Sequence, residues 1–358
     1  MAYTTINKST DYFNTKLYSG NGSTQTITGV GFQPDMVWTK ARSGTSATEN
    51  HNLYDAVRGA TKFLIPNGTS ASGTDTNSLT SFASDGFGVG TRTDINGANT
   101  ELASWNWKAN GAGSANTDGT AANVTVSANT TAGFSIVQFD ATQSRVSVGH
   151  GLGSTPDAIF MKETEGASGW VVGGFGLDWS GYFSLQSNNA FNNDSNDSSG
   201  TGRMFTPDGY APTSSVWSTN GSAFLSGGTK TCIAYCFKSI KGYSKFGTYI
   251  GNGNDDGTFV YTGFKPQFVM VKASSGADSW QMTDHPRDKN VSPNFARLLA
   301  NASSAESTNT TWAKIEKFSN GFKMAGTDGV SNQNGRTYLY MAFGQSLVGS
   351  NNVPCTAR

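Results

Sequence analysis

The stretch Gly31-Phe32-Gln33-Pro34-Asp35-Met36-Val37-Trp38-Thr39-Lys40 decides the fold, because the chain repeats its pattern twice more. It returns as Gly151–Lys162 and as Gly263–Lys272, with a lysine six residues after the proline in every copy. The three prolines are 122 and 110 residues apart. A repeat of that length corresponds to one whole domain per copy, since the units of ordinary solenoids are much shorter.

The composition agrees with several folded domains and excludes some classes of protein. A chain of 358 residues is long for one core and sufficient for two or three domains. Only 14% of the residues are charged and the formal net charge is zero, so the basic surface of a nucleic-acid-binding protein is not expected. The sequence has no apolar run long enough to cross a membrane. Eight Trp and 22 Phe supply apolar area that disordered polymers lack, which favours folded β domains.

The repeated stretch predicts a buried strand in each copy. Its proline cannot donate to a sheet ladder and therefore marks the start of the strand. Both faces of the strand are largely apolar when the copies are placed in register, so we expect it to be covered on both sides or to lie deep in a sandwich. Lys40, Lys162 and Lys272 are expected at the water boundary, where a long side chain can reach solvent.

Short strands separated by turn signals predict an all-β fold made of three tandem β-sandwich modules of the jelly-roll, concanavalin/laminin-G-like type. We expect module 1 at 1–108, a linker at 109–122, module 2 at 123–240, module 3 at 241–346 and a C-terminal tail at 347–358. The linker is assigned because its small and polar residues cannot build a core. Residues 186–202, rich in Asn, Asp, Ser and Gly, are expected to form a mobile loop.

Two charged pairs occupy matching places in two of the copies. Asp55 and Arg58 in module 1 correspond to Asp284 and Arg287 in module 3, while module 2 has no such pair. The simplest interpretation is a structural ion pair that holds a loop in place. The alternative is a ligand site at the rim of the sandwich, which would use the arginine as a two-pronged donor.

Three aromatic residues of module 2 are candidates for ligand binding. Trp170, Trp179 and Tyr182 surround a Gly-rich segment, where aromatic rings could stack on sugars, although the core is the commoner place for Trp. The oxygen-rich segments Asn252–Gly257 and Asn192–Asp194 keep calcium open as an alternative, but neither matches a twelve-residue calcium loop. No zinc spacing is present, so no cofactor is expected.

A catalytic reading rests on few residues. Glu163 and Glu165 fall on one side of a strand, as the two carboxylates of a polysaccharide-cleaving enzyme would, but the glycines that follow indicate an exposed strand end. Nucleophile and phosphate-loop motifs are missing from the sequence. Cys232 and Cys236 lie about 13 Å apart along one expected strand, too far for a disulfide, and we expect them, like Cys355, to be unpaired core or surface residues. We expect no enzyme and no catalytic residue.

Several motifs carry a resemblance to a known family. The strings 18–23, 30–40, 82–90 and 105–109, together with 148–157 of module 2, resemble a module of virion proteins from tailed phages that infect marine bacteria and cyanobacteria. Module 3 departs from the pattern, because Gln267 follows the proline where the other copies have Asp. The resemblance implies a tail, fibre or head-decoration protein built from lectin-like jelly-roll modules, with no catalytic residues.

The expected function is therefore a non-enzymatic structural role in a bacteriophage virion, with assembly contacts and host attachment. Other virion proteins and a host-surface glycan or receptor are the expected partners, without nucleic acid or membrane insertion. A homo-oligomer, by analogy a trimer, is expected, and the chain would be made in the host cytoplasm without a signal peptide. The alternatives are a carbohydrate-binding adhesin or lectin and, more remotely, a polysaccharide depolymerase.

Overall fold

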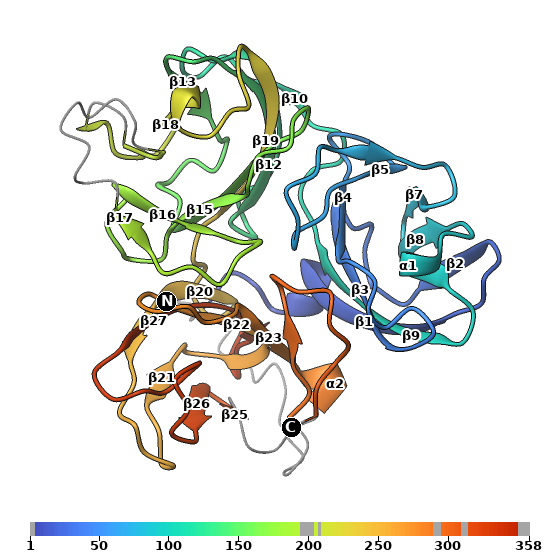
Figure 1. Ribbon diagram of the computed structural model, residues 1–358, viewed down its shortest axis with the longest axis vertical. Coiled ribbons are helices and arrows are strands. Elements are labelled where there is room, and N and C mark those ends of the chain that lie inside the picture. Colours follow the sequence, from blue (N-terminus) through green and yellow to red (C-terminus); the bar gives the residue numbers. More distant parts are fainter. Residues whose placement is uncertain (1–3, 194–203, 207–208, 289–294, 309–313, 350–358) are drawn as a thin grey trace.

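The computed structural model describes residues 4–193, 204–206, 209–288, 295–308 and 314–349. Antiparallel sheets make up most of its regular structure (Figure 1), so the all-β prediction is confirmed. Helix is limited, within these ranges, to short segments such as α1 (Thr93–Asn96) and α2 (His285–Asp288). None of the described helices is long and apolar enough to span a membrane.

Four equivalent strands form the main sheet of each repeat. Residues 1–108, 123–240 and 241–346 are called repeats 1, 2 and 3. Each sheet contains an opening strand, the closing strand, the strand of the repeated stretch and the strand after it, in that spatial order. In repeat 1 these are β1 (Phe13–Gly20), β9 (Thr100–Trp107), β3 (Met36–Gly44) and β4 (Asn52–Asp55). In repeat 2 they are β12 (Phe134–Ala141), β19 (Lys230–Phe237), β14 (Ala158–Glu163) and β15 (Val171–Gly174). In repeat 3 they are β20 (Ser244–Ile250), β27 (Thr337–Gln345), β22 (Lys265–Ala273) and β23 (Gln281–Asp284).

Further strands extend two of these sheets. Repeat 3 adds β24 (Leu298–Leu299), and the sheet of repeat 2 continues through β16 (Gly181–Ser184) and β17 (Asn192–Asn193) on one side and through β11 (Ala122–Asn129) and β10 (Ser114–Ala115) on the other. Residues 109–122, expected to be only a linker, thus include an edge strand. Residues 194–202 of the expected mobile loop lie outside the described residues, as does most of the expected tail.

A smaller sheet faces each main sheet. These are β2 (Gln25–Thr28), β8 (Gly86–Val89) and β7 (Leu79–Ala83) in repeat 1, β13 (Arg145–Gly149) and β18 (Val216–Asn220) in repeat 2, and β21 (Phe259–Tyr261), β26 (Gly321–Ala325) and β25 (Lys314–Phe318) in repeat 3. Repeat 1 also has the short pair β5 (Lys62–Phe63) and β6 (Gly73–Thr74). Each pair of facing sheets encloses its own buried apolar cluster.

The opposite faces of the three main sheets share one central core. Alternation along the strand sends Val37 into the cluster of repeat 1, whereas Met36 and Trp38 enter the central core. Phe160 of repeat 2 and Met270 of repeat 3 enter the same core. The repeated strand is thus covered on both sides, as its apolar pattern predicts, and the three repeats surround a common centre (Figure 1).

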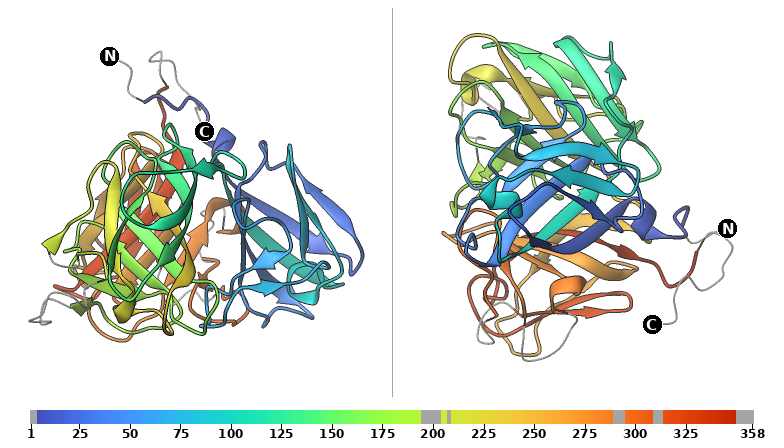
Figure 2. Two further views of the ribbon diagram at one scale, coloured as in Figure 1. Left: turned by 90° about the horizontal axis from the view of Figure 1, so that it is seen from above. Right: turned by 90° about the vertical axis from the view of Figure 1, so that its right-hand side faces the viewer.

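The first and last described segments meet. The Ser9 backbone N–H donates to Gln345 Oε1 over 2.7 Å, and the Gln345 amide donates to the Asn7 carbonyl over 3.2 Å. Figure 2 shows the two segments leaving the molecule on the same side. Repeat 3 is therefore joined to the start of repeat 1, and the three repeats form a closed ring.

Candidate functional site

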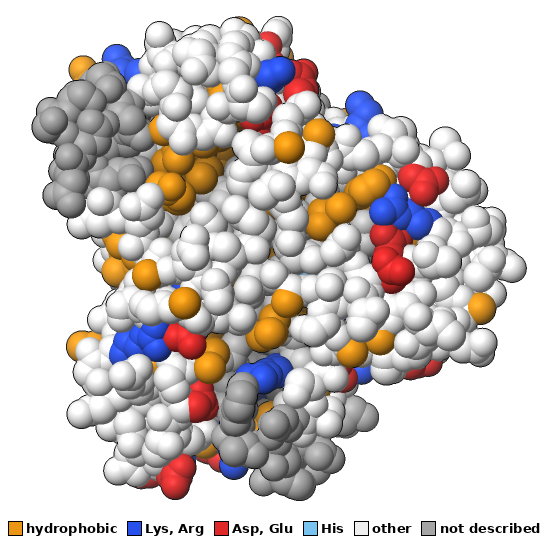
Figure 3. All heavy atoms as spheres, in the orientation of Figure 1, with side chains coloured by type: hydrophobic (Ala, Val, Ile, Leu, Met, Phe, Trp, Pro, Cys, Tyr) orange, Lys and Arg blue, Asp and Glu red, His pale blue; other side chains and the backbone are white. Residues whose placement is uncertain are grey.

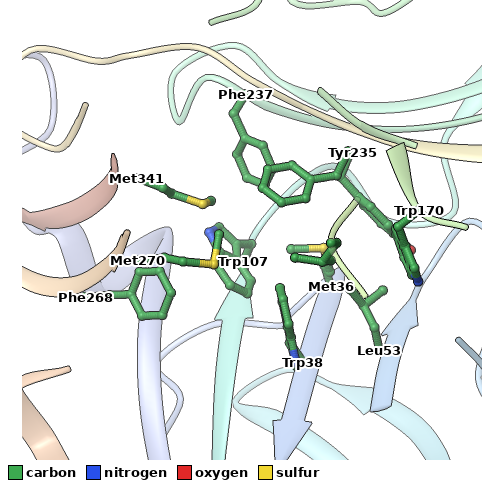
Figure 4. Close-up of a pocket in the computed structure, with 12 residues that line it drawn as sticks. Met36, Trp38, Leu53, Trp107, Trp170, Tyr235, Phe237, Phe268, Met270 and Met341 are labelled. Atoms are coloured by element: carbon green, nitrogen blue, oxygen red, sulfur yellow. The ribbon is translucent and has the colours of Figure 1, made fainter. Parts of the chain in front are cut away.

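The central core leaves almost no space for a ligand. Aromatic and methionine side chains from all three repeats converge around a cavity of about 20 Å³, as Figure 4 shows. Trp38, Tyr235 and Met270 represent the three repeats in its wall. A cavity of this size has room for a water molecule at most, and its apolar lining offers water no partners. The core therefore holds the repeats together and is not a binding site.

Two tryptophans tie neighbouring repeats together through their indole N–H groups. Trp170 directly precedes β15 and donates to the Ile65 carbonyl of repeat 1 over 3.0 Å. Trp280 directly precedes β23 and donates to the Ser184 carbonyl of repeat 2 over 3.1 Å. Trp170 is fully buried, so this candidate for sugar stacking exposes no ring face and has a structural role instead.

His51 makes the third bond of the same kind, because it directly precedes β4 in repeat 1. Its Nδ1 accepts from Trp38 Nε1 over 2.9 Å, so the ring proton resides on Nε2. Nε2 lies 3.0 Å from the Leu299 carbonyl of repeat 3 and donates to it. Burial, and then the charge of Lys40, lower the pKa of His51 to about 3, so the ring is neutral. The three bonds run from repeat 1 to 3, from 2 to 1 and from 3 to 2.

An amide side chain within the same repeat fixes each of these three residues. The amide oxygen accepts the backbone N–H of the bridging residue over 2.9 Å in every repeat. Each amide residue lies two positions after the bridging carbonyl of its own repeat. The pairs are His51 with Asn67, Trp170 with Gln186, and Trp280 with Asn301. All three repeats thus share the ring-to-carbonyl hydrogen bond and the side-chain amide that positions the bridging residue.

The first predicted ion pair lies at the contact between repeats 1 and 2. Arg58 Nε donates to Asp55 Oδ2 over 2.6 Å, and its backbone N–H donates to Asp55 Oδ1 over 2.8 Å. The Tyr235 hydroxyl of repeat 2 donates to Asp55 Oδ2 over 2.7 Å. Both charged side chains are almost fully buried, which agrees with a structural ion pair, although Arg58 also contributes to the lining of a groove between repeats 1 and 2. The pair fixes the loop after β4 and also binds the next repeat.

The second predicted ion pair lies at the contact between repeats 3 and 1. Arg287 Nε donates to Asp284 Oδ2 over 2.5 Å, and Trp105 Nε1 of repeat 1 donates to the same oxygen over 2.9 Å. Glu306 then bridges Arg287 and Arg42 of repeat 1, at 2.9 and 3.0 Å. Trp105 and Tyr235 occupy equivalent places on the closing strands, so the two pairs are arranged alike.

The third contact replaces the ion pair with apolar packing. Gly174 holds the register position of the two aspartates, and Met341 holds that of the two ring donors. Phe175 follows with a positive φ of 65° and lies between Phe160 of its own repeat and Phe246 of repeat 3, with ring centres 6.1 Å from each. A methionine cannot donate a hydrogen bond, which is consistent with the loss of the carboxylate here.

The three repeated lysines are buried, and the expectation that they lie at the water boundary is wrong. Lys40, Lys162 and Lys272 donate to the carbonyl of the residue that follows them, at 2.7, 2.5 and 2.9 Å. Lys40 also donates to the Ala47 carbonyl over 2.7 Å. Burial lowers the pKa of each lysine to about 8. Carbonyls replace water around each ammonium group: the loop after the strand supplies a second one to Lys40 and Lys162, whereas Lys272 lies 3.4 Å from the Asn188 carbonyl of repeat 2.

One open pocket lies in repeat 2 and separates the aromatic candidates. It measures about 380 Å³ and includes Trp170, Tyr182 and Phe224 in its lining. Tyr182 is partly buried, and its hydroxyl accepts from Asn192 Nδ2 over 2.9 Å. Trp179 does not line this pocket; its ring packs at 5.6 Å from that of Phe205. The structure therefore leaves Tyr182 as the accessible aromatic residue of the predicted set at this pocket.

The two glutamates do not form a catalytic pair. Glu163 is buried, contrary to the expected exposed strand end, and accepts from the Ser226 backbone N–H at 2.8 Å and hydroxyl at 2.6 Å. Burial acts to raise the pKa of Glu163, but these hydrogen bonds outweigh it and lower the pKa. Glu165 is exposed and lines a groove of about 370 Å³ between repeats 1 and 2. The two carboxylates thus face separate surroundings.

The remaining polar candidates take part in local structure. In the Asn252–Gly257 segment, Asn252 Oδ1 accepts from the Asn254 backbone and from the Asn332 amide, both at 3.0 Å. No group of three His, Cys, Asp or Glu side chains suited to a metal ion occurs in the described ranges. Cys232 and Cys236 are free and buried, while Asp194 and Cys355 lie outside these ranges.

The fold and its interfaces define an all-β protein with three repeats around one shared core. The chain belongs to the family described as a domain of unknown function, DUF7483, whose model matches residues 8–346. That match spans all three repeats, so the family corresponds to the whole ring and not to a single repeat. A comparison with curated proteins gave no match.

The face in Figure 3 is formed largely by uncharged polar groups and backbone, with scattered charged side chains.

Proposed function

We propose that the protein is a non-enzymatic structural component of a bacteriophage virion, in the tail, in a fibre or on the capsid, that mediates assembly contacts and host attachment. The observation that carries the proposal is the closed set of contacts between repeats. Three ring-to-carbonyl bonds, together with the bonds from Tyr235 and Trp105 to the two buried aspartates, join them into one body. Such a body suits a particle component, and the resemblance of the repeated motifs to phage virion modules supports the same role.

We further propose that each repeat is a β-sandwich module of the jelly-roll, concanavalin/laminin-G-like type. The facing antiparallel sheets and the buried cluster between them support this assignment. A single chain already arranges three modules around one centre. A homo-oligomer, such as a trimer of chains, would add a further level of assembly, and light scattering on the purified protein would measure it.

Mass spectrometry of gradient-purified phage particles tests the virion role. We expect the protein at stoichiometric levels in the particles, and cryo-electron microscopy should show the three-lobed ring at a defined position. The proposal is overturned if the protein is abundant in infected cells but missing from the purified particles. A polysaccharide-cleaving activity of the purified protein would also contradict a purely structural role, and its loss in Glu163→Gln or Glu165→Gln would assign it to these carboxylates.

A further inference from the structure

The outer face of one small sheet carries exposed aromatic rings. Phe259, Tyr261 and Phe318, in β21 and β25 of repeat 3, are 45%, 55% and 41% exposed. They are three of the six large apolar side chains that are exposed in the described part of the chain. The other three are distributed elsewhere, so this sheet concentrates exposed ring surface on one face. We call these three residues the aromatic face.

The strand register brings the three rings together. Tyr261 and Phe318 are both paired with Gly321 of the middle strand β26, on opposite sides of it, so their Cα atoms lie about 10 Å apart. Phe259 leans over the same glycine, since a Cβ atom on Gly321 would lie 2.8 Å from the Phe259 ring. The Phe259 and Phe318 ring centres are 6.0 Å apart. Gly321 therefore leaves the space in which the Phe259 and Phe318 rings meet, with Tyr261 beside the same glycine on the other strand.

Repeat 1 shows that the fold does not require these rings. Its β2, β8 and β7 pair in the same register, and Gly86 takes the place of Gly321. Thr26 and Thr28 stand at the positions of Phe259 and Tyr261, and Ala83 stands at the position of Phe318. The inward residues of the two sheets remain apolar in both repeats. Exposed aromatic rings have thus been placed on a sheet whose counterpart carries small residues.

Charged groups border the aromatic face and restrict what can bind there. Lys323 stands on the middle strand between Phe259 and Glu316, 2.9 Å from Asp256 and 3.4 Å from Glu316, and its ammonium lies 5.9 Å from the centre of the Phe318 ring. Lys245 Nζ lies 5.7 Å from the centre of the Tyr261 ring. A lipid or an apolar protein surface would remove water from these charges without replacing its hydrogen bonds. A ligand with an apolar face and many hydroxyl groups would contact the rings and also supply donors and acceptors to the charges.

We propose that the aromatic face binds the pyranose rings of a glycan chain. The C–H bonds on one face of a pyranose carry partial positive charge, which suits the negative faces of aromatic rings. The distance across the three strands allows more than one sugar unit to lie on the face. Glycan binding would explain the proposed role in host attachment, on which this inference rests. It can be tested with the purified chain, whatever the location of the protein in a particle.

An array of bacterial surface polysaccharides, together with cello-, xylo- and chito-oligosaccharides, tests the proposal. The ligands that bind are then titrated by isothermal calorimetry against single variants that copy repeat 1, namely Phe259→Thr, Tyr261→Thr and Phe318→Ala. We expect each variant to bind at least tenfold more weakly and the triple variant to show no binding. The melting temperature should remain within a few degrees of the wild type, because repeat 1 tolerates the same residues.

Tyr210→Ala provides the matched control. Tyr210 is 56% exposed and lies 4.2 Å from the Arg145 guanidinium in repeat 2, away from the aromatic face, so its loss should leave glycan binding unchanged. The proposal is overturned if the wild type binds no glycan, or if the triple variant binds as tightly as the wild type. It is also overturned if binding depends on Tyr182 of the repeat 2 pocket, or if the rings instead mediate self-association or vesicle binding. Failure of the virion role would show up in the particles and not in these titrations.

Discussion

The Tyr235 hydroxyl of repeat 2 donates to the buried carboxylate of Asp55 in repeat 1 over 2.7 Å. The same place in the next contact is filled by the Trp105 indole of repeat 1, which donates to Asp284 of repeat 3 over 2.9 Å. Each carboxylate therefore depends on a neighbouring repeat for one of its hydrogen bonds. The two ion pairs, each formed within one repeat, therefore also connect that repeat to its neighbour.

Tyr235→Phe should lower the free energy of unfolding by about 1.5 to 3 kcal/mol, since a buried charged group loses a hydrogen bond. Urea unfolding followed by tryptophan fluorescence would measure the change. Met341→Leu alters the equivalent position of the contact that has no carboxylate, and it should cost less than about 1.5 kcal/mol. Equal losses in the two variants would contradict the role assigned to the Tyr235 hydroxyl.

Lys40→Met should change how stability depends on alkaline pH. The pKa of Lys40 is about 8 in the folded protein, below the value of about 10.4 expected for an unfolded chain. Between these values the unfolded chain binds the proton that the folded protein lacks, so this lysine makes stability rise as the pH increases. As the pH rises from 8 to 10, the free energy of unfolding of the wild type should therefore increase relative to that of Lys40→Met, by at most about 1.4 kcal/mol per pH unit.

Urea titrations at several pH values would show this gain as a widening difference between the two proteins. Lys8→Met is the control, because the Lys8 side chain is 64% exposed and forms only a short-range pair with Asp11. A constant difference between wild type and Lys40→Met across the range would show that the lysine is not buried as described.

His51→Gln should reduce the loss of stability in acid. The folded pKa of His51 is about 3, whereas the unfolded value is about 6.5, so its contribution is present above pH 6.5 and is lost as the pH falls toward 3. The slope is about 1.4 kcal/mol per pH unit for one such group. Melting curves from pH 4 to 7 should be less steep in pH for the variant than for the wild type, even if the variant is less stable overall. Parallel curves would rule out a neutral, buried His51.

Repeat 2 produced alone should self-associate. Repeat 2 together with its edge strand β10, residues 109–240, would expose the central-core side chains Phe134, Phe160, Tyr235 and Phe237. The full chain should instead unfold in one calorimetric transition, because all three repeats share that core. A monomeric, well-folded repeat 2, or three separate transitions in the full chain, would be inconsistent with the shared core.

The sequence was most informative where side chains repeat. Largely apolar residues on both faces of the repeated strand predicted that it is covered on both sides, and the spacing of Asp55 and Arg58 predicted their pairing. Partners from other repeats could not be predicted, because the acceptors at Ile65, Ser184 and Leu299 are backbone carbonyls, which have no signature in the sequence.

Two other features had signals that were weaker or misleading. Trp170 and Trp280 each follow the repeated lysine by eight residues, but His51 follows Lys40 by eleven, which hides their equivalence. A lysine after an apolar run is typical of a strand end, and it does not reveal that a loop will fold over the ammonium group. The exposure of Phe259 and Tyr261 could have been inferred by aligning them with Thr26 and Thr28, since the residue between each pair is apolar in both repeats.

The ring formed by the three repeats has a consequence for how the molecule can diverge. In a symmetric trimer of separate chains, one mutation alters all three joints at once, so a change such as tryptophan to histidine must be tolerated three times. Covalent continuity removes that restriction. His51 at one joint, Phe175 at another and the aromatic face on a single repeat are each present once per molecule. A chain of this design can change one repeat at a single joint or surface while the other two keep the original residues at the equivalent place.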